Sequence, residues 1–281
     1  MKYFYPLLFL PVFCFGQRQD EKLLLYNVAF GAVTSTIGAM INKPRNSSWK
    51  EVALKSLWQG SIGGLLHYGG KKSTWLINKH QSLGYAWPAK LLHNAGSCII
   101  ENAALNQPFL QNWNIDFGPV RFDFSFNGKK PFTARFLPFS IYSVIAGSQD
   151  GRFDLRSTLL TGNIAFISDS VLGEGDLGYS YGRSIVYTRN HPFTYHVLAH
   201  ELVHQFQHNE FMVLNTWLAP LQSKVKSERL KTIFKKYIYI DIPWFIPTYI
   251  IEGEHSLVEY YRNFFEFEAE RFATNKNVYV P

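Results

Sequence analysis

The first third of the chain contains three apolar segments with the length of helices. Residues 23–42 carry no charge, and two further segments cover residues 49–68 and 86–105. The first is long enough to cross a membrane. Its polar and small residues favour a helix that is buried or dips into a membrane over one that spans it. We therefore predict a helical N-terminal region over residues 17–108.

Small residues recur at helical spacing in these segments. Gly31, Ser35 and Ala39 are four residues apart, so on a helix they form one line. A line of small residues lets a second helix approach closely. The next segment carries small residues as well, namely Gly60, Gly63 and Gly64. We expect a close helix–helix contact along the line.

The pattern changes near Pro108 to the period of strands. Residues 120–126 alternate strictly between apolar and polar, and Asn127–Gly128 then supplies a turn signal. Clusters of Gly, Asp and Ser separate the later apolar stretches. Those stretches cover residues 132–146, 153–167 and 179–188. Together they predict a meander of antiparallel strands within residues 113–188.

Two helices are expected after the strands. The first covers residues 192–211, with Asn190 or Thr194 as its cap and Pro192 in its first turn. The second covers residues 256–273. The predicted fold class is therefore α+β: a helical N-terminal region, then an antiparallel meander that leads into a two-helix core over residues 109–281.

The first sixteen residues have the pattern of a secretory signal peptide. Lys2 gives a short positive region, residues 3–15 an apolar one, and Gly16 a small residue before a cut. Cys14 raises the alternative of a lipoprotein, although the bulky Phe13 precedes it. We predict residues 1–16 to be a signal peptide, and hence an exported chain of the periplasm or cell envelope.

The composition supports a large core. Of the 281 residues, 47% are hydrophobic, 17% aromatic and 17% charged. After removal of the signal peptide Cys98 is the remaining cysteine, so no internal disulfide can form. We expect Cys98 to be a small buried hydrophobic residue.

The net charge of +7 is compatible with contact to an anionic membrane surface. Residues 222–236 are basic, and the aromatic segment 237–247 follows, as at the interfacial anchors of membrane proteins. The alternative is a solvated helix followed by a core strand. Nucleic acid is not an expected partner, because the chain is exported and carries no recognisable binding motif.

Residues 173–178 match the glycine pattern of a dinucleotide-binding loop. Such a loop must open a helix, whereas the residues that follow have the pattern of a turn and a strand. We therefore expect no nucleotide to bind there.

The sequence His200-Glu201-Leu202-Val203-His204 carries the clearest chemistry. On a helix, His200 and His204 are one turn apart on the same face and can bind one metal ion. Glu201 lies about 100° further round and can address a water on that ion. This pattern is typical of a zinc site with a general base. His196 and His208 extend the stripe and need not be ligands. They could donate to the groups around the site or lie at its rim, but we expect them to be solvent-exposed.

A catalytic zinc needs a third protein ligand. The positions at which the metzincin pattern needs glycine and histidine hold Gln207 and Glu210. The best candidate lies further on, at Glu266, which shares a helix face with Glu270. One carboxylate of such a pair can bind the metal while the other orients a ligating histidine. Rival third ligands are Glu252, Glu254 and Glu259.

These motifs resemble those of gluzincin zinc peptidases, especially the CAAX-prenyl-endopeptidase and HtpX type. The resemblance covers the C-terminal third, about residues 179–273. It implies a zincin-like fold in which Glu266 is the third ligand, Ala269 packs tightly, and Glu270 stands where the family usually has Asp. It also implies that residues 182–188 form the edge strand that pairs with an extended peptide substrate. The pairing residues are Ser184, Ile185, Val186 and Tyr187.

A donor that stabilises the oxyanion is also expected opposite the base. His255, Tyr260 and Tyr261 are the candidates, and the sequence does not choose among them.

Taken together, these patterns predict an exported endopeptidase with one Zn²⁺ ion. His200, His204 and Glu266 would hold the metal, and Glu201 would act as the base in cleaving a peptide or protein substrate. Two alternatives stay open: a non-hydrolytic envelope protein stabilised by zinc, and a membrane-associated structural or assembly protein.

Overall fold

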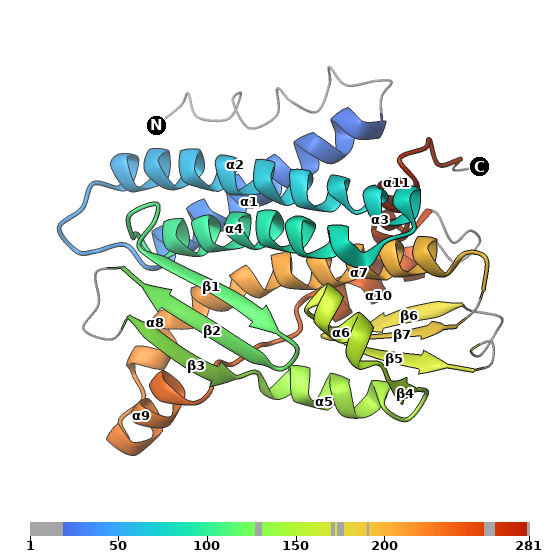
Figure 1. Cartoon of the computed structure of the whole chain (residues 1–281). Coiled ribbons are helices and arrows are strands. Elements are labelled where there is room, and N and C mark those ends of the chain that lie inside the picture. Colours follow the sequence, from blue (N-terminus) through green and yellow to red (C-terminus); the bar gives the residue numbers. More distant parts are fainter. Residues whose placement is uncertain are drawn as a thin grey trace.

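The N-terminal helices lie side by side in one layer above a long central helix, and two small sheets lie beneath that helix (Figure 1). This computed structural model describes residues 19–126, 131–169, 172, 177–189, 191–255 and 262–279. The predicted signal peptide, with Cys14, and the predicted turn Asn127–Gly128 lie outside the described residues.

In the described residues, helices come first, short strands and two helices lie between residues 112 and 188, and the remaining elements are helices. The helices are α1 Gln19–Ile41, α2 Trp49–Ser73, α3 Trp75–His80, α4 Ala86–Ala104, α5 Pro138–Gly147, α6 Leu155–Thr161, α7 Thr194–Met212, α8 Ala219–Ser223, α9 Glu228–Lys236, α10 Phe245–His255 and α11 Phe264–Thr274. The strands are β1 Asn112–Phe117, β2 Val120–Ser125, β3 Phe132–Phe136, β4 Arg152–Phe153, β5 Ile164–Ser168, β6 Gly178–Tyr181 and β7 Ser184–Thr188. Short 3-10 helices cover Leu83–Tyr85 and Val213–Leu218.

The predicted close contact between the first two helices is confirmed. A Cβ atom placed on Gly60 of α2 would lie 1.9 Å from Ser35 Oγ of α1. One placed on Gly31 would lie 2.4 Å from Gly60 O. Only small residues fit where the two backbones approach this closely.

Helix α1 is the one helix among the described residues that is long and apolar enough to cross a membrane, by length and composition. A core helix passes the same test. The face of α1 that carries Leu23, Asn27 and Gly31 is buried against the rest of the protein.

The strands form two sheets. β1, β2 and β3 are an antiparallel meander, as predicted. The second sheet has the order β4-β5-β7-β6, and β5 pairs with β7 in parallel. The prediction of one antiparallel meander is therefore correct for the first sheet and wrong for the second.

Two stretches predicted as strands contain helices. The predicted strand 132–146 ends at Phe136, because Pro138 begins α5 and the backbone N–H groups of Phe139 and Ser140 donate to the carboxylate of Asp241. In 153–167, Asp154 caps α6 by accepting from Arg156 N, and Gly162, with φ of +69°, ends it.

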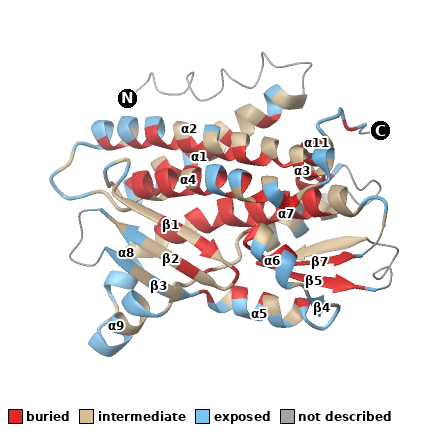
Figure 2. Cartoon of the chain, viewed as in Figure 1, coloured by how far each residue is buried: buried red, intermediate tan, exposed pale blue. Residues whose placement is uncertain are grey.

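The N-terminal region and the rest of the chain share one core. Ile77, Leu83 and Ala89 pack in the same hydrophobic cluster as Leu198 and Leu202 of α7. Figure 2 shows α7, β5 and β7 largely buried, with α9 at the exposed periphery. The hydrophobic core is therefore continuous across residue 108, the predicted end of the N-terminal region. Cys98 is buried, as predicted, and burial raises the pKa of its thiol to about 12.

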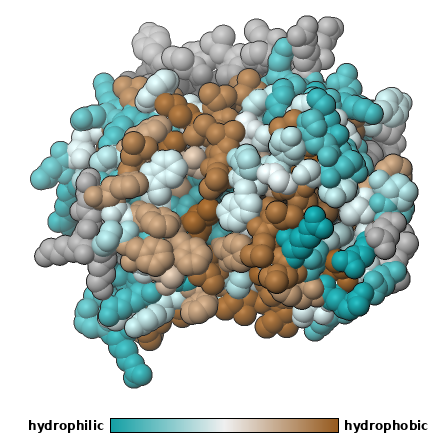
Figure 3. Space-filling model, viewed as in Figure 1, coloured by the Kyte–Doolittle hydropathy of each residue, from teal (hydrophilic) through white to brown (hydrophobic). Residues whose placement is uncertain are grey.

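Apolar side chains are exposed on several outer helix faces (Figure 3). On α2, Leu54 and Trp58 are 70% and 66% exposed. The predicted basic segment contains α9, and the chain that follows packs on the first sheet: the ring of Tyr239 lies 4.2 Å from Arg121 Cζ. This agrees with a solvated helix followed by a packed segment, although the latter is not a regular strand.

Candidate metal centre

Helix α7 carries the predicted metal-binding motif into the middle of the protein. Every residue from Leu198 to Met212 is buried, including His200, Glu201 and His204. Buried polar side chains are stable only where they are hydrogen-bonded or bind an ion. The partners of these three side chains therefore indicate what the site is built to do.

Three side chains converge as the sequence predicted. The Nε2 atoms of His200 and His204 are 3.1 Å apart, and the carboxylate of Glu266 lies 3.1 Å from the first and 3.3 Å from the second. Ligands bound at about 2.1 Å in a tetrahedral site are about 3.4 Å apart. The two imidazole planes cross at 72°, so both rings can direct a lone pair at one point. This donor set fits a metal ion such as zinc.

The electrostatics of these groups favour a cation. Burial alone would lower the pKa of His200, but Glu266 and Glu270 outweigh it and raise that pKa to about 10. The pKa of His204 is also raised, because Glu266 outweighs burial. Burial would raise the pKa of Glu266, but the two histidines hold it below its usual range. Positive charge, as protons or as a metal ion, is stabilised here.

Glu270 lies beside the ligating histidine, in the position expected of an orienting carboxylate. Its Oε2 is 3.5 Å from His200 Nδ1 and accepts a hydrogen bond from His196 Nε2 at 2.9 Å. Burial would raise the pKa of Glu270, but His196 and His200 lower it to about 2. His196 is therefore a donor beside the site, which is the alternative to the solvent-exposed position that we expected for it.

Gln207 orients the second histidine, and the sequence analysis missed this role. Its Oε1 accepts from His204 Nδ1 at 2.7 Å, while its amide nitrogen donates to Phe265 O and to Glu268 Oε2. Because both amide protons are used, the amide oxygen faces His204 and keeps the proton on Nδ1. Nε2, which lies 3.3 Å from Glu266 Oε1, is then the nitrogen left to bind a metal ion. The available signal was the three-residue spacing from His204.

A cleft of about 350 Å³ opens on one side of these residues. It runs between β6 and α10 over the surface of α7. It is lined by Gly178, Tyr179, Ser180, Tyr181, Gly182, Glu201, His204, His208, Phe245, Ile246, Tyr249 and Glu266. Glu201 and two of the three candidate metal ligands thus face a space that a substrate can enter.

Gly178 lets β6 lie close to α7. A Cβ atom there would lie 2.4 Å from Val197 Cγ1 and 3.6 Å from Glu201 Cγ. Gly178 is also the last glycine of the nucleotide-like pattern, and a strand begins there, as expected. The start of that pattern, residues 173–176, lies outside the described residues.

The strand predicted to pair with a substrate is not at the edge of its sheet. β7 lies between β5 and β6, and all its residues are buried. The prediction that Ser184, Ile185, Val186 and Tyr187 offer an edge is wrong. Their nearly continuous apolar run is the pattern of an interior strand. The edge beside the cleft is β6.

The structure does not test the predicted oxyanion donors. Tyr260 and Tyr261 lie outside the described residues, as does the side chain of His255. Instead, Tyr249 of α10 lines the cleft and its hydroxyl donates to Glu266 Oε1 at 2.5 Å. No sequence motif marks Tyr249.

Among the rival third ligands, Glu252 lines a different pocket beside Gln19 and Lys22. The side chain of Glu254 and the whole of Glu259 lie outside the described residues. The carboxylate that meets both histidines is Glu266.

His208 is buried, contrary to the prediction. Only 2% of its surface is exposed, and it lines the cleft one turn beyond His204. Burial lowers the pKa of its imidazole to about 3, with a further contribution from Arg183, so the ring is neutral near pH 7.

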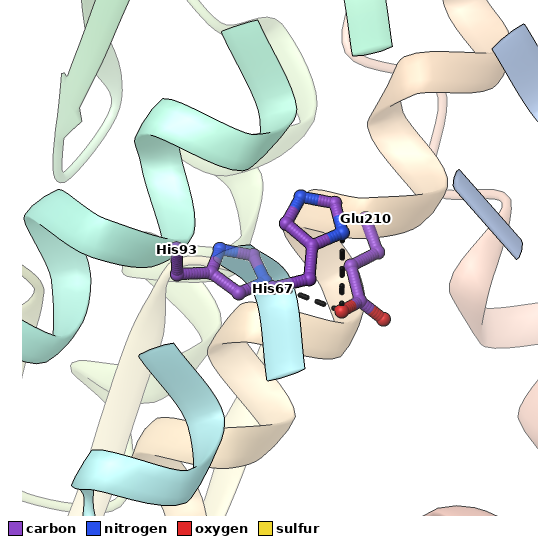
Figure 4. Close-up of side chains that lie close together, drawn as sticks. All are labelled: His67, His93 and Glu210. Atoms are coloured by element: carbon purple, nitrogen blue, oxygen red, sulfur yellow. Dashed lines mark hydrogen bonds and ion pairs between the residues drawn. The ribbon is translucent and has the colours of Figure 1, made fainter. Parts of the chain in front are cut away.

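A second group of metal-ligand types lies deeper, where α2, α4 and α7 meet (Figure 4). Glu210 Oε1 is 3.4 Å from His67 Nδ1 and 3.3 Å from His93 Nε2. The two imidazoles, however, are stacked, with planes only 13° from parallel and centroids 4.3 Å apart. An ion in the plane of one ring would lie well outside the plane of the other. This arrangement suits hydrogen bonding to Glu210 better than metal binding.

Lys71 joins the two groups. Its Nζ donates to Glu210 Oε2 at 2.8 Å and to Glu268 Oε2 at 2.7 Å, and all three side chains are buried. Glu268 is also the acceptor for Gln207. A continuous chain of polar contacts therefore runs from His204 through Gln207, Glu268 and Lys71 to Glu210.

Comparisons were made with known families, curated proteins and solved structures. No protein-family model, no curated protein and no solved structure matches this chain.

Proposed function

We propose that this chain is an exported, zinc-dependent endopeptidase of the gluzincin type. The observation that carries the proposal is the convergence of His200, His204 and Glu266 within 3.1–3.3 Å beside a cleft that also contains Glu201. A buried metal site that merely stabilises a fold has no need of a cleft or of an acid beside the ligands. Two histidines and one carboxylate also leave a fourth position for water or substrate.

The chemistry divides between the metal and the protein. Zinc, when bound, polarises the scissile carbonyl and lowers the pKa of a water molecule. Glu201 accepts a proton from that water and passes it to the leaving amine. Glu270 and Gln207 orient the imidazoles of His200 and His204, and so hold the ligand geometry during the reaction.

The substrate proposed is an extended peptide. β6 is an edge strand and lines the cleft, so its free side can add one strand of substrate by backbone hydrogen bonds. This replaces the pairing expected for β7. The added strand would run alongside β6, the strand with which it pairs.

The test is Glu201→Gln. This variant should bind one zinc ion as wild type does, because Glu201 is not a ligand, and should lose about 100-fold to 10,000-fold in peptide hydrolysis. Glu228→Gln is the control, since Glu228 is 82% exposed on α9. Zinc is measured by elemental analysis and hydrolysis with a quenched peptide library. Full activity of Glu201→Gln would refute the mechanism.

A membrane-associated envelope protein is the second candidate, and the exposed apolar face of α2 favours it. Leu54, Leu57 and Trp58 lie on this face, beside Lys50 and Lys55. Apolar side chains next to cations suit the surface of an anionic membrane. Co-sedimentation of wild type and Leu57→Glu with anionic vesicles tests this contact. A protein that binds vesicles and zinc but shows no hydrolysis above background, with or without Glu201, would be structural.

A further inference from the structure

His208 lines the cleft and carries polar atoms that no other described residue satisfies. Its side chain is 2% exposed, and neither Nδ1 nor Nε2 has a hydrogen-bond partner among the described residues. The ring stacks on Phe139, with planes 7° apart, and meets the edge of Phe245. These apolar contacts hold the imidazole in place but leave its polar atoms unpaired.

Unpaired buried polar groups are costly. A neutral imidazole has one donor and one acceptor, and leaving either unpaired in a protein interior costs the desolvation free energy of that group. Burial lowers the pKa of His208 to about 3, so the ring does not escape this cost by ionising near pH 7. A ligand that enters the cleft can supply the missing partners.

The position of His208 limits what that ligand group can be. It lies on α7 one turn, or about 5.4 Å, beyond His204. A substrate residue next to the cleaved bond can therefore reach it with a single long side chain. The cleft is also lined by Tyr181, Phe245, Ile246 and Tyr249. These side chains favour a substrate side chain with an apolar stem. An anionic tip would be repelled by Glu201 and Glu266, which line the same cleft. A cationic tip would gain no charge partner from the neutral imidazole of His208, so burying an ionised group against that ring would be unfavourable.

We propose that His208 is a specificity-determining residue that selects, next to the scissile bond, a long uncharged side chain with a hydrogen-bonding tip, such as tyrosine or glutamine. The apolar stem packs between β6 and α10, and the hydroxyl or amide at its tip pairs with the imidazole. This inference rests on the proposed peptidase function and names its substrate class.

The experiment compares matched peptides. Tyrosine and phenylalanine differ by one hydroxyl, and glutamine and methionine are close in shape, so each pair isolates the tip. With each residue placed in turn on either side of the cleaved bond, wild type should show kcat/KM about 10-fold higher for the polar member on one side. His208→Phe keeps an aromatic ring against Phe139 and should bring the ratio to about one. His208→Asn, with a donor and an acceptor, should restore part of it.

Two results would overturn the proposal: no preference in wild type on either side, or a preference that persists in His208→Phe protein with normal zinc content and melting temperature. The second would mean that a residue other than His208 pairs with the polar tip. Binding of N-acetyltyrosinamide and N-acetylphenylalaninamide to the Glu201→Gln protein, measured by calorimetry, tests the pocket without hydrolysis. If wild type cleaves no peptide but still distinguishes these amides through His208, the peptidase assignment fails and the pocket stands. Equal binding of the two amides together with no cleavage would refute both.

Discussion

Helix α7 contributes to two buried groups of histidine and glutamate that differ in the orientation of their rings. At His200 and His204 the imidazole planes cross at 72°, and Glu266 meets both nitrogen atoms. At His67 and His93 the planes are 13° apart, and one oxygen atom of Glu210, Oε1, contacts both rings. The first group borders a cleft, whereas all three side chains of the second are at most 1% exposed.

The difference shows why residue types alone do not define a metal site. A metal ion must lie near the plane of each imidazole that binds it. Crossed rings can satisfy this condition at one point, and stacked rings cannot. The first group therefore has the geometry of a metal centre. The second has that of a brace: together with Lys71, it ties α2 and α4 to α7 and, through Glu268, to α11.

Exchanging one residue in each group gives the largest expected effect. Glu266→Gln should weaken zinc binding more than about 100-fold, since a ligand loss exceeds the usual effect of an orienting residue. His93→Phe should keep one zinc ion and lose only stability, about 1–3 kcal/mol from the broken contact with Glu210. Elemental analysis measures the zinc content of the two variants, and competitive chelator titration measures their zinc affinity. A second zinc ion that is lost in His93→Phe would break the comparison.

Two neighbouring lysines test whether the group of His67, His93 and Glu210 stabilises the fold through Lys71. Lys71→Met leaves Glu210 and Glu268 buried without their shared cation, so unfolding should become easier by about 3–5 kcal/mol. Lys72→Met removes partly exposed contacts with Asp20 and with the hydroxyl of Tyr68, and should cost less than about 1 kcal/mol. Urea denaturation compares the two variants. Equal losses of stability would contradict the assignment of Lys71 to a structural network.

Two neighbouring glutamines test whether Gln207, which connects the two groups, orients His204 for metal binding. Gln207→Leu removes the acceptor for His204 Nδ1 and should weaken zinc binding about 10-fold to 100-fold. Gln205→Leu removes a similarly buried amide that donates to Ser184 O at 3.1 Å but does not contact a candidate ligand. It should lower stability without changing zinc affinity. Cobalt substitution provides a second readout, because its visible spectrum reports ligand geometry; identical spectra for Gln207→Leu and wild type would count against orientation by Gln207.

The two groups should also differ in how the stability of the metal-free protein depends on pH. The pKa of His200 is raised from 6.5 to about 10, so its stabilising proton is fully present below pH 6.5 and is lost as the pH rises toward 10. The pKa of His93 is lowered by burial, so His93 costs stability as the pH falls below 6.5. Each slope is at most about 1.4 kcal/mol per pH unit.

Denaturation midpoints between pH 5 and pH 10 separate these two contributions. His200→Gln should flatten the alkaline side of the profile, and His93→Phe the acid side. If both substitutions altered the same side, the electrostatic contrast between the two groups would be wrong.

Local signals in the sequence predicted several elements correctly. The lengths and small residues of the first helices, the alternation in 120–125 and the periodicity of α7 all agree with the structure. Other local signals were present but overridden. Asp154 and Gly162 are cap residues of α6, yet the apolar content of 153–167 favoured a strand. The carboxylate of Asp241 that caps α5 comes from a distant segment, so it left no local trace.

By itself, the sequence determined the spacing of His200, Glu201 and His204 on one helix, and the shared face of Glu266 and Glu270, because helical geometry places residues four apart together. Only the tertiary structure decided that Glu266 meets both histidines, that β6 rather than β7 is the edge, and that His208 faces the cleft. It also decided which histidine rings cross and which stack. These properties depend on how elements far apart in the chain pack, and packing sets both the direction of a side chain and its access to solvent.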